Sequence, residues 1–478
     1  MNRRYFLKIS ALGAAVFLNP ISLKAQLKPA KKPNIIFIFA DQWRAQACGY
    51  AGDPNLAGKT PHLDKLAGES VNLSNAVSTC PVCTPYRASL LTGQYPLSHG
   101  LFLNDAPLAQ NALSIAEVYK AEGYDTAYVG KWHIDGHGRG SYIPKERRQG
   151  FEYWKVLECT HDYNNSWYYA DEDQTKRRWQ GYDAIAQTHD IQEYLKANAN
   201  NEKPFIMFLS WGPPHAPYNT APEKYKNLFD PKDIKLSPNV PEPMKATAKK
   251  ELAGYYAHIA TLDECIGDIN KTIAQSGIKD NTILVFTSDH GDMLGSHAQR
   301  KKQNPYEESI KVPFLVRYPA KLGQVSRVID MPIGTPDIMP TLLGLCDIAI
   351  PASVEGTDYS KVLSGKTTAP DNAALIECLS PFGQWNRASG GKEYRGIRTK
   401  RYTYVRDLTG PWLLFDNEKD PYQLKNLVNS PESAAIQTNL EKQLAQKLQE
   451  RNDKFKDGAE YIKKWDYKVI NGTIPYRN

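Results

Sequence analysis

A short segment with the sequence CTPYRASLLTG combines a candidate nucleophile, Cys83, with the signals of a helix start. Thr84 is a favourable N-cap residue, Pro85 suits the first helical position, and Gly93 suits the position just past a helix end. The segment therefore predicts a short helix that begins right after Cys83. The positive end of that helix, reinforced by Arg87 one turn later, favours an anion beside the cysteine.

The same segment also contains a CxxC pair, because Cys80 precedes Cys83 by three positions. Such a pair forms either a thioredoxin-like redox centre or a local disulfide. The chain has 7 cysteines, an odd number spaced too irregularly for a disulfide scaffold. A redox pair explains none of the polar clusters elsewhere in the chain, so we favour a nucleophile at position 83.

Apolar runs predict the framework that positions this segment. Five of them look like strands buried on both faces and alternate with helical segments: residues 35–40, 126–130, 205–210, 282–288 and 312–316. This alternation is typical of a mostly parallel sheet covered by helices, which is an α/β fold. Further on, strand-like runs at 394–406 and 412–415 and a helical segment at 433–456 predict a smaller C-terminal α+β subdomain.

Four of these runs lead directly into polar clusters at their carboxyl ends. In chain order the clusters are Asp41-Gln42, Lys131-Trp132-His133, Trp211 to His215 and Asp289-His290-Gly291-Asp292. In open α/β sheets, ligands bind beyond the carboxyl ends of the strands. We therefore expect the four clusters to converge at one edge of the sheet and to form a single site.

The segment from Cys83 to Gly93 resembles the CxPxR signature, followed by LTG, of the formylglycine-dependent sulfatases. The resemblance runs over nearly the whole chain, through residues 34–36, 130–133, 287–291, 395–399 and 420–421. It implies an alkaline-phosphatase-like fold, hydrolysis of a sulfate ester, and oxidation of Cys83 to formylglycine by a separate maturating enzyme. A hydrated aldehyde carries two hydroxyls on one carbon, so that one attacks sulfur and the other later expels the sulfate.

The resemblance implies a catalytic set made of one nucleophile and several basic groups. The set is Cys83, Arg87, Lys131, His133, His215 and Lys302. Lys131 and Lys302 would hold sulfate oxygens and stabilise negative charge in the transition state. His133 would orient or deprotonate the formylglycine hydrate, and His215 would protonate the leaving alcohol or bind the sulfate. Taken alone, each histidine is more often structural, and a lysine in a loop is usually solvated.

The resemblance also implies a metal site. Its members would be Asp41, Gln42, Asp289, His290 and the modified Cys83. Two carboxylates at one sheet edge repel each other unless a cation lies between them, and hard oxygen ligands suit Ca²⁺ or Mg²⁺. Many relatives have a second aspartate in place of Gln42 and an asparagine in place of His290, and a histidine suits Mn²⁺ or Zn²⁺ better. We expect Ca²⁺, with Mn²⁺ or Mg²⁺ as alternatives; either aspartate alone would be explained as a helix cap.

Residues close to these motifs in sequence are candidates for contact with the substrate. They are Trp43, Arg44, His99, Asn104 and Asp105, with His137, Arg139, His161 and Arg395 as weaker candidates. The aromatic-rich stretch 136–201 looks like loop material over the sheet edge, where exposed rings would stack on sugars or else simply pack the loops. This stretch favours a sulfated carbohydrate as the substrate over a lipid or a small aryl sulfate.

Residues 1–25 have the pattern of an export signal. Arg3 and Arg4 precede an apolar stretch at 9–18, and Ala25 suits the position before a cleavage site. The basic run resembles a twin-arginine signal, and an ordinary secretory signal fits equally well. We expect an exported, periplasmic protein with a catalytic domain at 26–365 and a C-terminal subdomain at 366–478.

Charge and hydropathy argue against a nucleic-acid partner and against a membrane-spanning segment. The formal charge is +7, and four of the positive charges lie in residues 1–25, so a nucleic-acid partner is not implied. The apolar stretch in the signal is shorter than the roughly 20 residues of a membrane span, and no later segment is long and free of charge. Three rival functions stay open: a phosphoester or phosphonate hydrolase of the same superfamily, a non-catalytic protein that binds sulfated glycans, and a thiol redox protein.

Overall fold

The computed structural model describes residues 31–324, 326–370, 372–470 and 472–476. Pro33–Asn478 forms one compact unit, which is the part described below. The predicted export signal, residues 1–25, lies outside the described residues. None of the described helices is long and apolar enough to cross a membrane.

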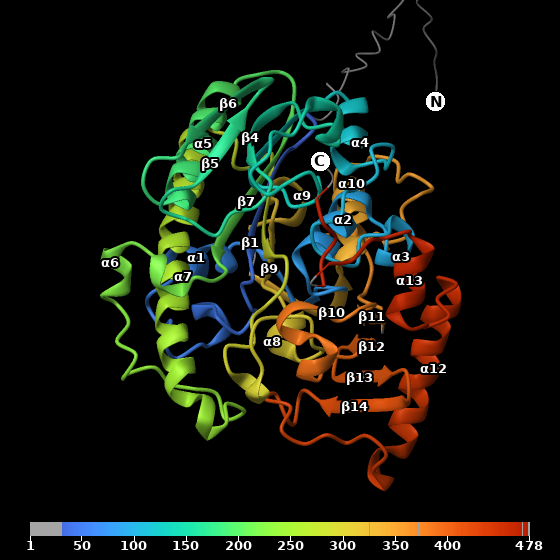
Figure 1. Ribbon diagram of the computed structural model, residues 1–478. Helices are drawn as coiled ribbons and strands as arrows, with labels where there is room; N and C mark the ends of the chain where they lie inside the picture. The colour runs from blue at the N-terminus through green and yellow to red at the C-terminus, as the bar shows by residue number, and fades with distance from the viewer. Residues whose placement is uncertain (1–30, 325, 371, 471, 477–478) are drawn as a thin grey trace, which may run out of the picture. The chain divides into compact units, whose positions relative to one another are not determined.

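Within the described residues, ten strands form one mixed sheet (Figure 1). Their order across the sheet is β10 (Arg327–Gly334), β2 (Val71–Val77), β9 (Phe314–Arg317), β8 (Thr282–Ser288), β1 (Asn34–Asp41), β7 (Phe205–Pro214), β3 (Asp125–Lys131), β4 (Tyr153–Leu157), β5 (Trp167–Ala170) and β6 (Asp173–Arg178). The central strands β8, β1, β7, β3 and β4 run parallel to one another. Their carboxyl ends therefore meet at one edge of the sheet.

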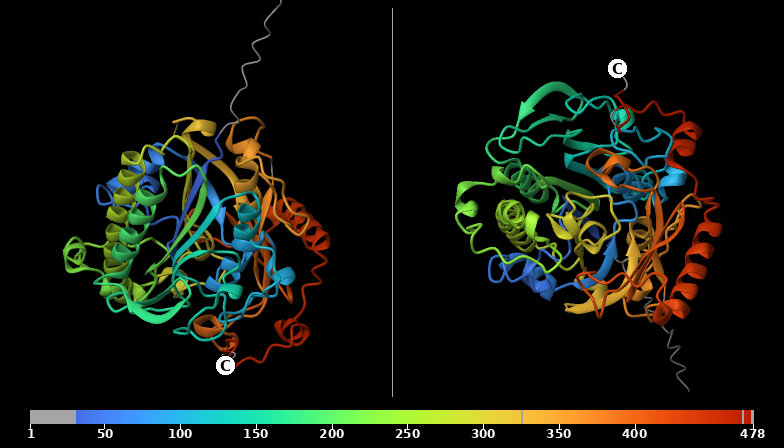
Figure 2. Two further views of the ribbon diagram at one scale, coloured as in Figure 1. Left: turned by 90° about the horizontal axis from the view of Figure 1, so that it is seen from above. Right: turned by 60° about the horizontal axis from the view of Figure 1, so that its bottom comes forward.

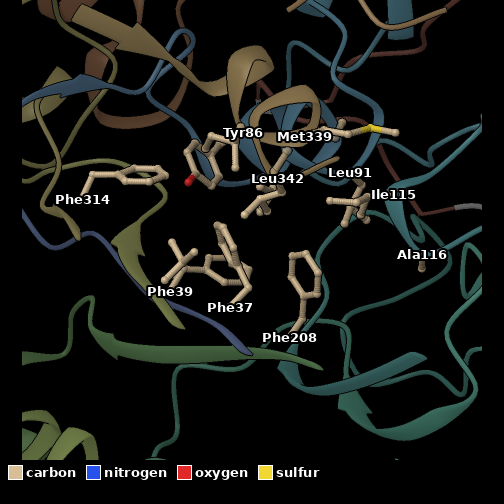
Figure 3. Close-up of a cluster of buried hydrophobic side chains, with 14 of the residues drawn as sticks. Phe37, Phe39, Tyr86, Leu91, Ile115, Ala116, Phe208, Phe314, Met339 and Leu342 are labelled. Carbon is tan, nitrogen blue, oxygen red and sulfur yellow. The ribbon is translucent and has the colours of Figure 1, made fainter. Parts of the chain in front are cut away.

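Alternate residues of β1 enter two hydrophobic cores, one on each face of the sheet. Phe37 and Phe39 belong to the first core, and Ile36 and Ile38 belong to the second. The first core is covered by α2 (Cys83–Thr92), α4 (Ile115–Ala121) and α10 (Ile338–Leu345), whose side chains meet the strand phenylalanines in Figure 3. The second is covered by α1 (Pro61–Gly68), α5 (Asp183–Asn198) and α7 (Lys245–Gln275), which Figure 2 shows as a separate layer.

A second, four-stranded antiparallel sheet lies in the C-terminal part of the chain (Figure 1). It consists of β11 (Ala373–Cys378), β12 (Tyr394–Thr399), β13 (Tyr402–Asp407) and β14 (Gly410–Asp416). Helix α12 (Ala434–Glu450) packs on it through Leu440, Leu444 and Leu448, which recur at helical spacing. The remaining helices are α3 (Pro96–His99), α6 (Glu223–Lys226), α8 (Glu307–Ile310), α9 (Pro319–Leu322), α11 (Ser360–Leu363) and α13 (Gly458–Lys464). The α/β class with a small C-terminal sheet is confirmed.

Two local predictions need correction. The fifth apolar run, 312–316, forms β9, but β9 is antiparallel to both of its neighbours because the chain returns to it from the edge where β8 ends. The stretch 136–201 is not mainly loop: it holds β4, β5, β6 and α5. Most of its aromatic rings are buried among these elements, including Trp154, Tyr163, Trp179 and Tyr182, so for them the packing alternative is the right one.

Candidate active site

Helix α2 places Cys83 at its first position. The preceding residue, Val82, is the N-cap, with an extended backbone and no side-chain capping bond, so the predicted Thr84 cap is wrong. Instead the Thr84 N–H donates to Asn104 Oδ1 at 3.2 Å, which satisfies one helix-end donor from outside the helix. Gly93 ends the helix with a left-handed backbone (φ 66°), as predicted.

The Cys83 thiol is surrounded by buried charged groups from three other segments. Lys302 Nζ lies 2.9 Å from Cys83 Sγ, His290 Nε2 lies 3.3 Å away and Asp41 Oδ1 lies 3.6 Å away. Burial and the Asp41 charge raise the pKa of the thiol, but the positive charges of Lys131, Lys302 and His290 together hold it well below its usual range. The position is thus set up to stabilise an anion.

Arg87 and Lys131 hold the acidic groups in place. Lys131 Nζ lies 2.5 Å from Asp41 Oδ2, and Arg87 Nη2 lies 3.5 Å from Asp41 Oδ2 and 3.3 Å from Asp289 Oδ2. The other guanidinium nitrogen of Arg87 donates to the Lys131 carbonyl and to Ser210 Oγ. This network ties α2 to the ends of β1, β3, β7 and β8, as the convergence of the strand ends requires.

The donor set at these strand ends fits a divalent metal. Ligand atoms of Asp41, Cys83, Asp289 and His290 all lie within 4.8 Å of one another, and all four residues are buried. Burial and the Asp41 charge raise the pKa of Asp289, which is the repulsion that a cation would relieve. His290 Nδ1 faces the Gly291 carbonyl at 2.9 Å, so a neutral ring donates there and leaves Nε2 free to coordinate.

Gln42 fits the same centre. Its Oε1 atom is buried without a hydrogen-bond partner among the described residues. Its Nε2 atom donates to Asp292 Oδ2 at 2.5 Å, which fixes the orientation of the amide. Its backbone N–H donates to Asp289 Oδ1, and its φ of 71° is unusual for a residue other than glycine. An oriented, unpaired amide oxygen beside two carboxylates is a suitable oxygen ligand.

His133 is held through one ring nitrogen. Its Nε2 lies 2.9 Å from Asp105 Oδ1, while its Nδ1 is buried without a partner within the described part of the chain. Asp105 also accepts from Arg139 Nη2 at 3.1 Å and from the Tyr476 hydroxyl at 2.6 Å. Burial lowers the pKa of His133, but Cys159 and the hydrogen bond to Asp105 help to raise it to about 9. Asp105 thus orients the His133 ring and raises its pKa.

His215 lies at the half-buried side of the site. Its Nδ1 is 2.8 Å from the Ala216 carbonyl, which leaves Nε2 as the available nitrogen. Its ring stacks on His161 with the ring centroids 4.4 Å apart. Burial is the largest cause of a low pKa in both rings, and the pKa of His161 falls to about 3. At neutral pH these rings are therefore uncharged.

Three candidate substrate contacts are buried and have partners within the protein. The Trp43 indole is fully buried and donates to the Ala47 carbonyl, and His99 is bonded at both ring nitrogens, to Ser89 Oγ and the Leu101 N–H. Arg44 is buried beside Tyr255 and Tyr256. Their burial and internal contacts are those of residues that stabilise the fold.

The weaker candidates divide between the two sheets. His137 pairs with Asp135, close in sequence to the His133 loop. His161 stacks on His215, and Arg139 bonds Asp105. Arg395, by contrast, is buried in the small sheet and pairs with Asp453 and Glu377. Within the described part of the chain, the hydrogen bonds of its guanidinium stay in the C-terminal region and do not reach the centre.

Sequence reasoning missed several supporting residues. Asp292 stands in a polar cluster that was recognised, but its bond to Gln42 was not predicted. Glu158 accepts the backbone N–H groups of His133, Asp135 and Gly136 and so fixes the loop after β3. Tyr476 lies more than 300 positions from its partners, and no local signal marks it.

Comparison with known proteins identifies the family. The sulfatase family profile matches residues 33–348, and the profile of the C-terminal region of N-sulphoglucosamine sulphohydrolase matches residues 295–450. An ulvan-active sulfatase of Formosa agariphila is 48% identical over 93% of this chain and 87% of its own length. An endo-4-O-sulfatase of Bacteroides thetaiotaomicron is 32% identical, covering 95% of this chain and 97% of its own length.

A solved structure agrees. A protein from work on the metabolism of multiple glycosaminoglycans by Bacteroides thetaiotaomicron superimposes with a TM-score of 0.79 at 32% identity, over 93% of this chain and 100% of that one. The chain belongs to the sulfatase family and is a sulfuric ester hydrolase. The resemblance stated from the sequence is confirmed.

Proposed function

We propose that this enzyme removes sulfate groups from a sulfated carbohydrate, with Cys83 oxidised to formylglycine and a Ca²⁺ ion beside it. The observation that carries the proposal is the position of Cys83 at the head of α2, within hydrogen-bond reach of Lys302 and His290. The carbohydrate is supported by the relatives, which include an ulvan-active sulfatase and an endo-4-O-sulfatase.

Formylglycine and the metal would supply the reactive groups. The hydrated aldehyde would offer one hydroxyl for attack on sulfur and a second for release of the sulfate, and a bound divalent cation would lower the pKa of the attacking hydroxyl. Asp41, Gln42, Asp289 and His290 would hold the cation. Ca²⁺ suits their oxygens; the His290 nitrogen keeps Mn²⁺ as an alternative, and Mg²⁺ is a second.

The chain's own basic residues act on the sulfate. Lys302 and Lys131 provide buried positive charge for its oxygens, where donors in a water-poor site act most strongly. Arg87 pairs with both aspartates and keeps them oriented.

The two site histidines move protons. His133 is fixed at Nε2 by Asp105, so its Nδ1 is the atom that exchanges a proton near position 83. His215 is fixed at Nδ1, so its Nε2 is the atom that would take up a proton once the negative charge of a bound sulfate raises the pKa of the ring, and that would then pass this proton to the leaving alcohol. Arg139 and Tyr476 act as positioning residues, because they contact Asp105.

Sulfate release from a panel of sulfated mono-, di- and polysaccharides tests the proposal, with the phosphate ester of one alcohol as comparator. We expect sulfate release to depend on formylglycine, which mass spectrometry of the peptide around position 83 detects, and to be absent in Cys83→Ser. Chelation should abolish activity, and Ca²⁺ should restore it better than Mn²⁺ or Mg²⁺. Turnover of the phosphate ester alone, or full activity with an unmodified thiol, would contradict the proposal.

Export and maturation belong to the same proposal. The basic and apolar pattern of residues 1–25 supports export to the periplasm, and a twin-arginine route would allow a cytoplasmic maturating enzyme to act on Cys83 before transport. Amino-terminal sequencing of periplasmic protein, together with the mass of the peptide around position 83, tests both points. A periplasmic form that retains the Cys83 thiol would contradict modification of Cys83 before transport.

A further inference from the structure

The free edge of the large sheet carries an unusual hairpin, formed by β5 and β6 (Figure 1). All six residues of β6 are exposed, and three consecutive ones, Lys176, Arg177 and Arg178, are cationic. On β5, Trp167 is 39% exposed, whereas most aromatic rings of the surrounding stretch are buried. A large ring and a row of cations therefore lie together in solvent.

The strand register places three of these side chains on one face. Trp167 is paired with Arg178 across the hairpin, and Lys176 is two residues along β6, so all three point the same way. Lys176 Nζ and the Arg178 guanidinium carbon each lie 5.4 Å from the Trp167 ring centroid. We call Trp167, Lys176 and Arg178 the hairpin face.

The opposite side of the hairpin is built differently. Tyr168 stacks on the buried Trp179 with ring centroids 4.6 Å apart, and Arg177 forms an ion pair with Asp173. On that side the aromatic ring is packed against another ring, and the positive charge is neutralised by an ion pair.

A series of contacts links the hairpin face to Asp105, the partner of His133. Lys176 Nζ lies 3.7 Å from the point where a Cβ atom of residue 140 would stand, and the Tyr169 hydroxyl donates to the Gly140 carbonyl at 3.0 Å. The neighbouring residue, Arg139, is 43% exposed and binds Asp105, the partner of His133. Two exposed cations, Arg139 and Lys176, are thus part of the series that connects Asp105 to Trp167.

Protection of the sheet edge explains only part of this arrangement. Natural edge strands often carry lysines that prevent pairing with other chains, which accounts for charge on β6. It does not account for an exposed tryptophan between the cations, because an exposed large ring promotes association. A ring flanked by cations matches a sugar unit that carries anionic groups, since the ring covers the sugar face and the cations meet its charges.

We propose that the hairpin face is a distal binding surface for an anionic polysaccharide, which holds sugar units next to the one that loses its sulfate. The inference rests on the proposed carbohydrate substrate and adds that the substrate is an extended polyanion rather than a single sugar. Trp167 stacks on a sugar ring, and Lys176 and Arg178 pair with its sulfate or carboxylate groups.

Binding of ulvan to enzyme that cannot turn it over tests the surface. In the Cys83→Ser background, isothermal titration calorimetry should show that Lys176→Ser/Arg178→Ser weakens binding about ten-fold or more, with a shallower dependence on salt. Trp167→Ala should weaken binding about three- to ten-fold. Lys176→Arg/Arg178→Lys should bind like the parent, because it keeps both charges.

A charge-matched control removes two exposed lysines from the C-terminal part, Lys366→Ser/Lys442→Ser. This variant should bind ulvan within about two-fold of the parent if only local charges matter. An equal loss in the control, or unchanged binding in both hairpin variants, would overturn the inference.

A kinetic comparison separates the surface from the proposed function. In enzyme with Cys83 intact, the hairpin variants should raise the KM for the polysaccharide and leave kcat/KM for a sulfated monosaccharide unchanged. Failure of all forms to release sulfate from any carbohydrate would instead reject the carbohydrate substrate. Equal losses on polymer and monosaccharide would reject the distal surface while leaving the sulfatase reaction in place.

Discussion

Two clusters of buried charge in this protein are built in opposite ways. In the first, Arg398 of β12 donates to both carboxylate oxygens of Glu307 in α8, at 2.8 and 3.0 Å. Its remaining donors meet the Thr399 and Lys400 carbonyls and Asn75 Oδ1. Every guanidinium donor has a partner, so this cluster is complete within the chain and ties the small sheet to α8 and β2.

In the active centre, by contrast, several buried polar atoms have no hydrogen-bond partner among the described residues. Gln42 Oε1 and His133 Nδ1 are buried without partners among the described residues, and Lys302 has a thiol where a carboxylate would neutralise it. Gln42 and His133 also have positive φ values, which store backbone strain. We infer that buried charged groups whose hydrogen bonds are all formed stabilise the fold, whereas buried groups with unsatisfied hydrogen-bonding atoms are available to bind a ligand. The following predictions test whether this distinction holds.

The largest effect on folding should come from Arg398→Met. Removing one partner of a buried ion pair leaves Glu307 uncompensated, which typically costs about 3–5 kcal/mol of unfolding free energy. Denaturant titration measures the loss, and kcat of the folded fraction at low temperature should stay within about three-fold, because no catalytic contact is removed. Arg398→Met/Glu307→Leu should regain part of the stability; a double variant no better than the single one would count against the pairing.

Lys302→Met should behave in the reverse way. Loss of a charge that stabilises the transition state should lower kcat by about 10²–10³-fold, whereas unfolding free energy should change little, because the buried Lys302 ammonium contacts the residue at position 83 rather than a carboxylate. Steady-state kinetics and denaturant titration measure the two effects. The neighbouring Lys301, which donates to the Tyr218 hydroxyl at 3.1 Å, provides the control Lys301→Met, whose kcat should be nearly unchanged. A Lys302 variant that loses unfolding free energy in proportion to its loss of activity would contradict the distinction between the two clusters.

Tyr476→Phe tests whether the chain's final described segment positions His133 for the proposed proton exchange. Loss of the hydroxyl removes one donor to Asp105, and we expect kcat to fall about three- to thirty-fold with KM nearly unchanged. Tyr467→Phe is the matched control, since the Tyr467 hydroxyl bonds the Gly100 carbonyl at 3.0 Å, away from Asp105. In an Asp105→Ala background the effect of Tyr476→Phe should vanish. Equal effects of the two phenylalanine variants, or a rise in KM alone, would argue for a different role.

The smallest effect should appear at His99, which belongs to the saturated type. Burial lowers the pKa of His99 from 6.5 to about 3, so the unfolded chain takes up a proton near pH 6.5 that the folded protein refuses. The wild type therefore loses stability at this residue as pH falls below about 6.5, by about 2 kcal/mol at pH 5. His99→Gln, destabilised at pH 7.5 by lost hydrogen bonds, should close the gap to wild type by that amount at pH 5. A gap that does not change with pH would disprove the assignment.

Local patterns in the sequence were enough for the central strands and for the proposed nucleophile, but not for β4, β5 and β6. Runs of apolar residues buried on both faces can only be central strands, so β1, β3, β7 and β8 were predictable. The carboxyl ends of parallel strands must share one edge, which brought Asp41, Lys131, His215 and Asp289 into one hypothesis. Helix signals around Cys83 predicted a helix start close to it, but the helix begins at Cys83 itself rather than after the predicted Thr84 cap, and Asn104 rather than a local cap satisfies the Thr84 N–H.

What the sequence alone determined is the chemistry at the strand ends, because period and composition are local properties of the chain. The tertiary structure alone decided which polar atoms stay unpaired, that Trp43 and His99 are enclosed, and that Tyr476 reaches Asp105. It also decided that Trp167 and two cations share one exposed face of the β5–β6 hairpin. These outcomes depend on contacts between segments far apart in the chain, and no local pattern encodes the partner of a distant side chain.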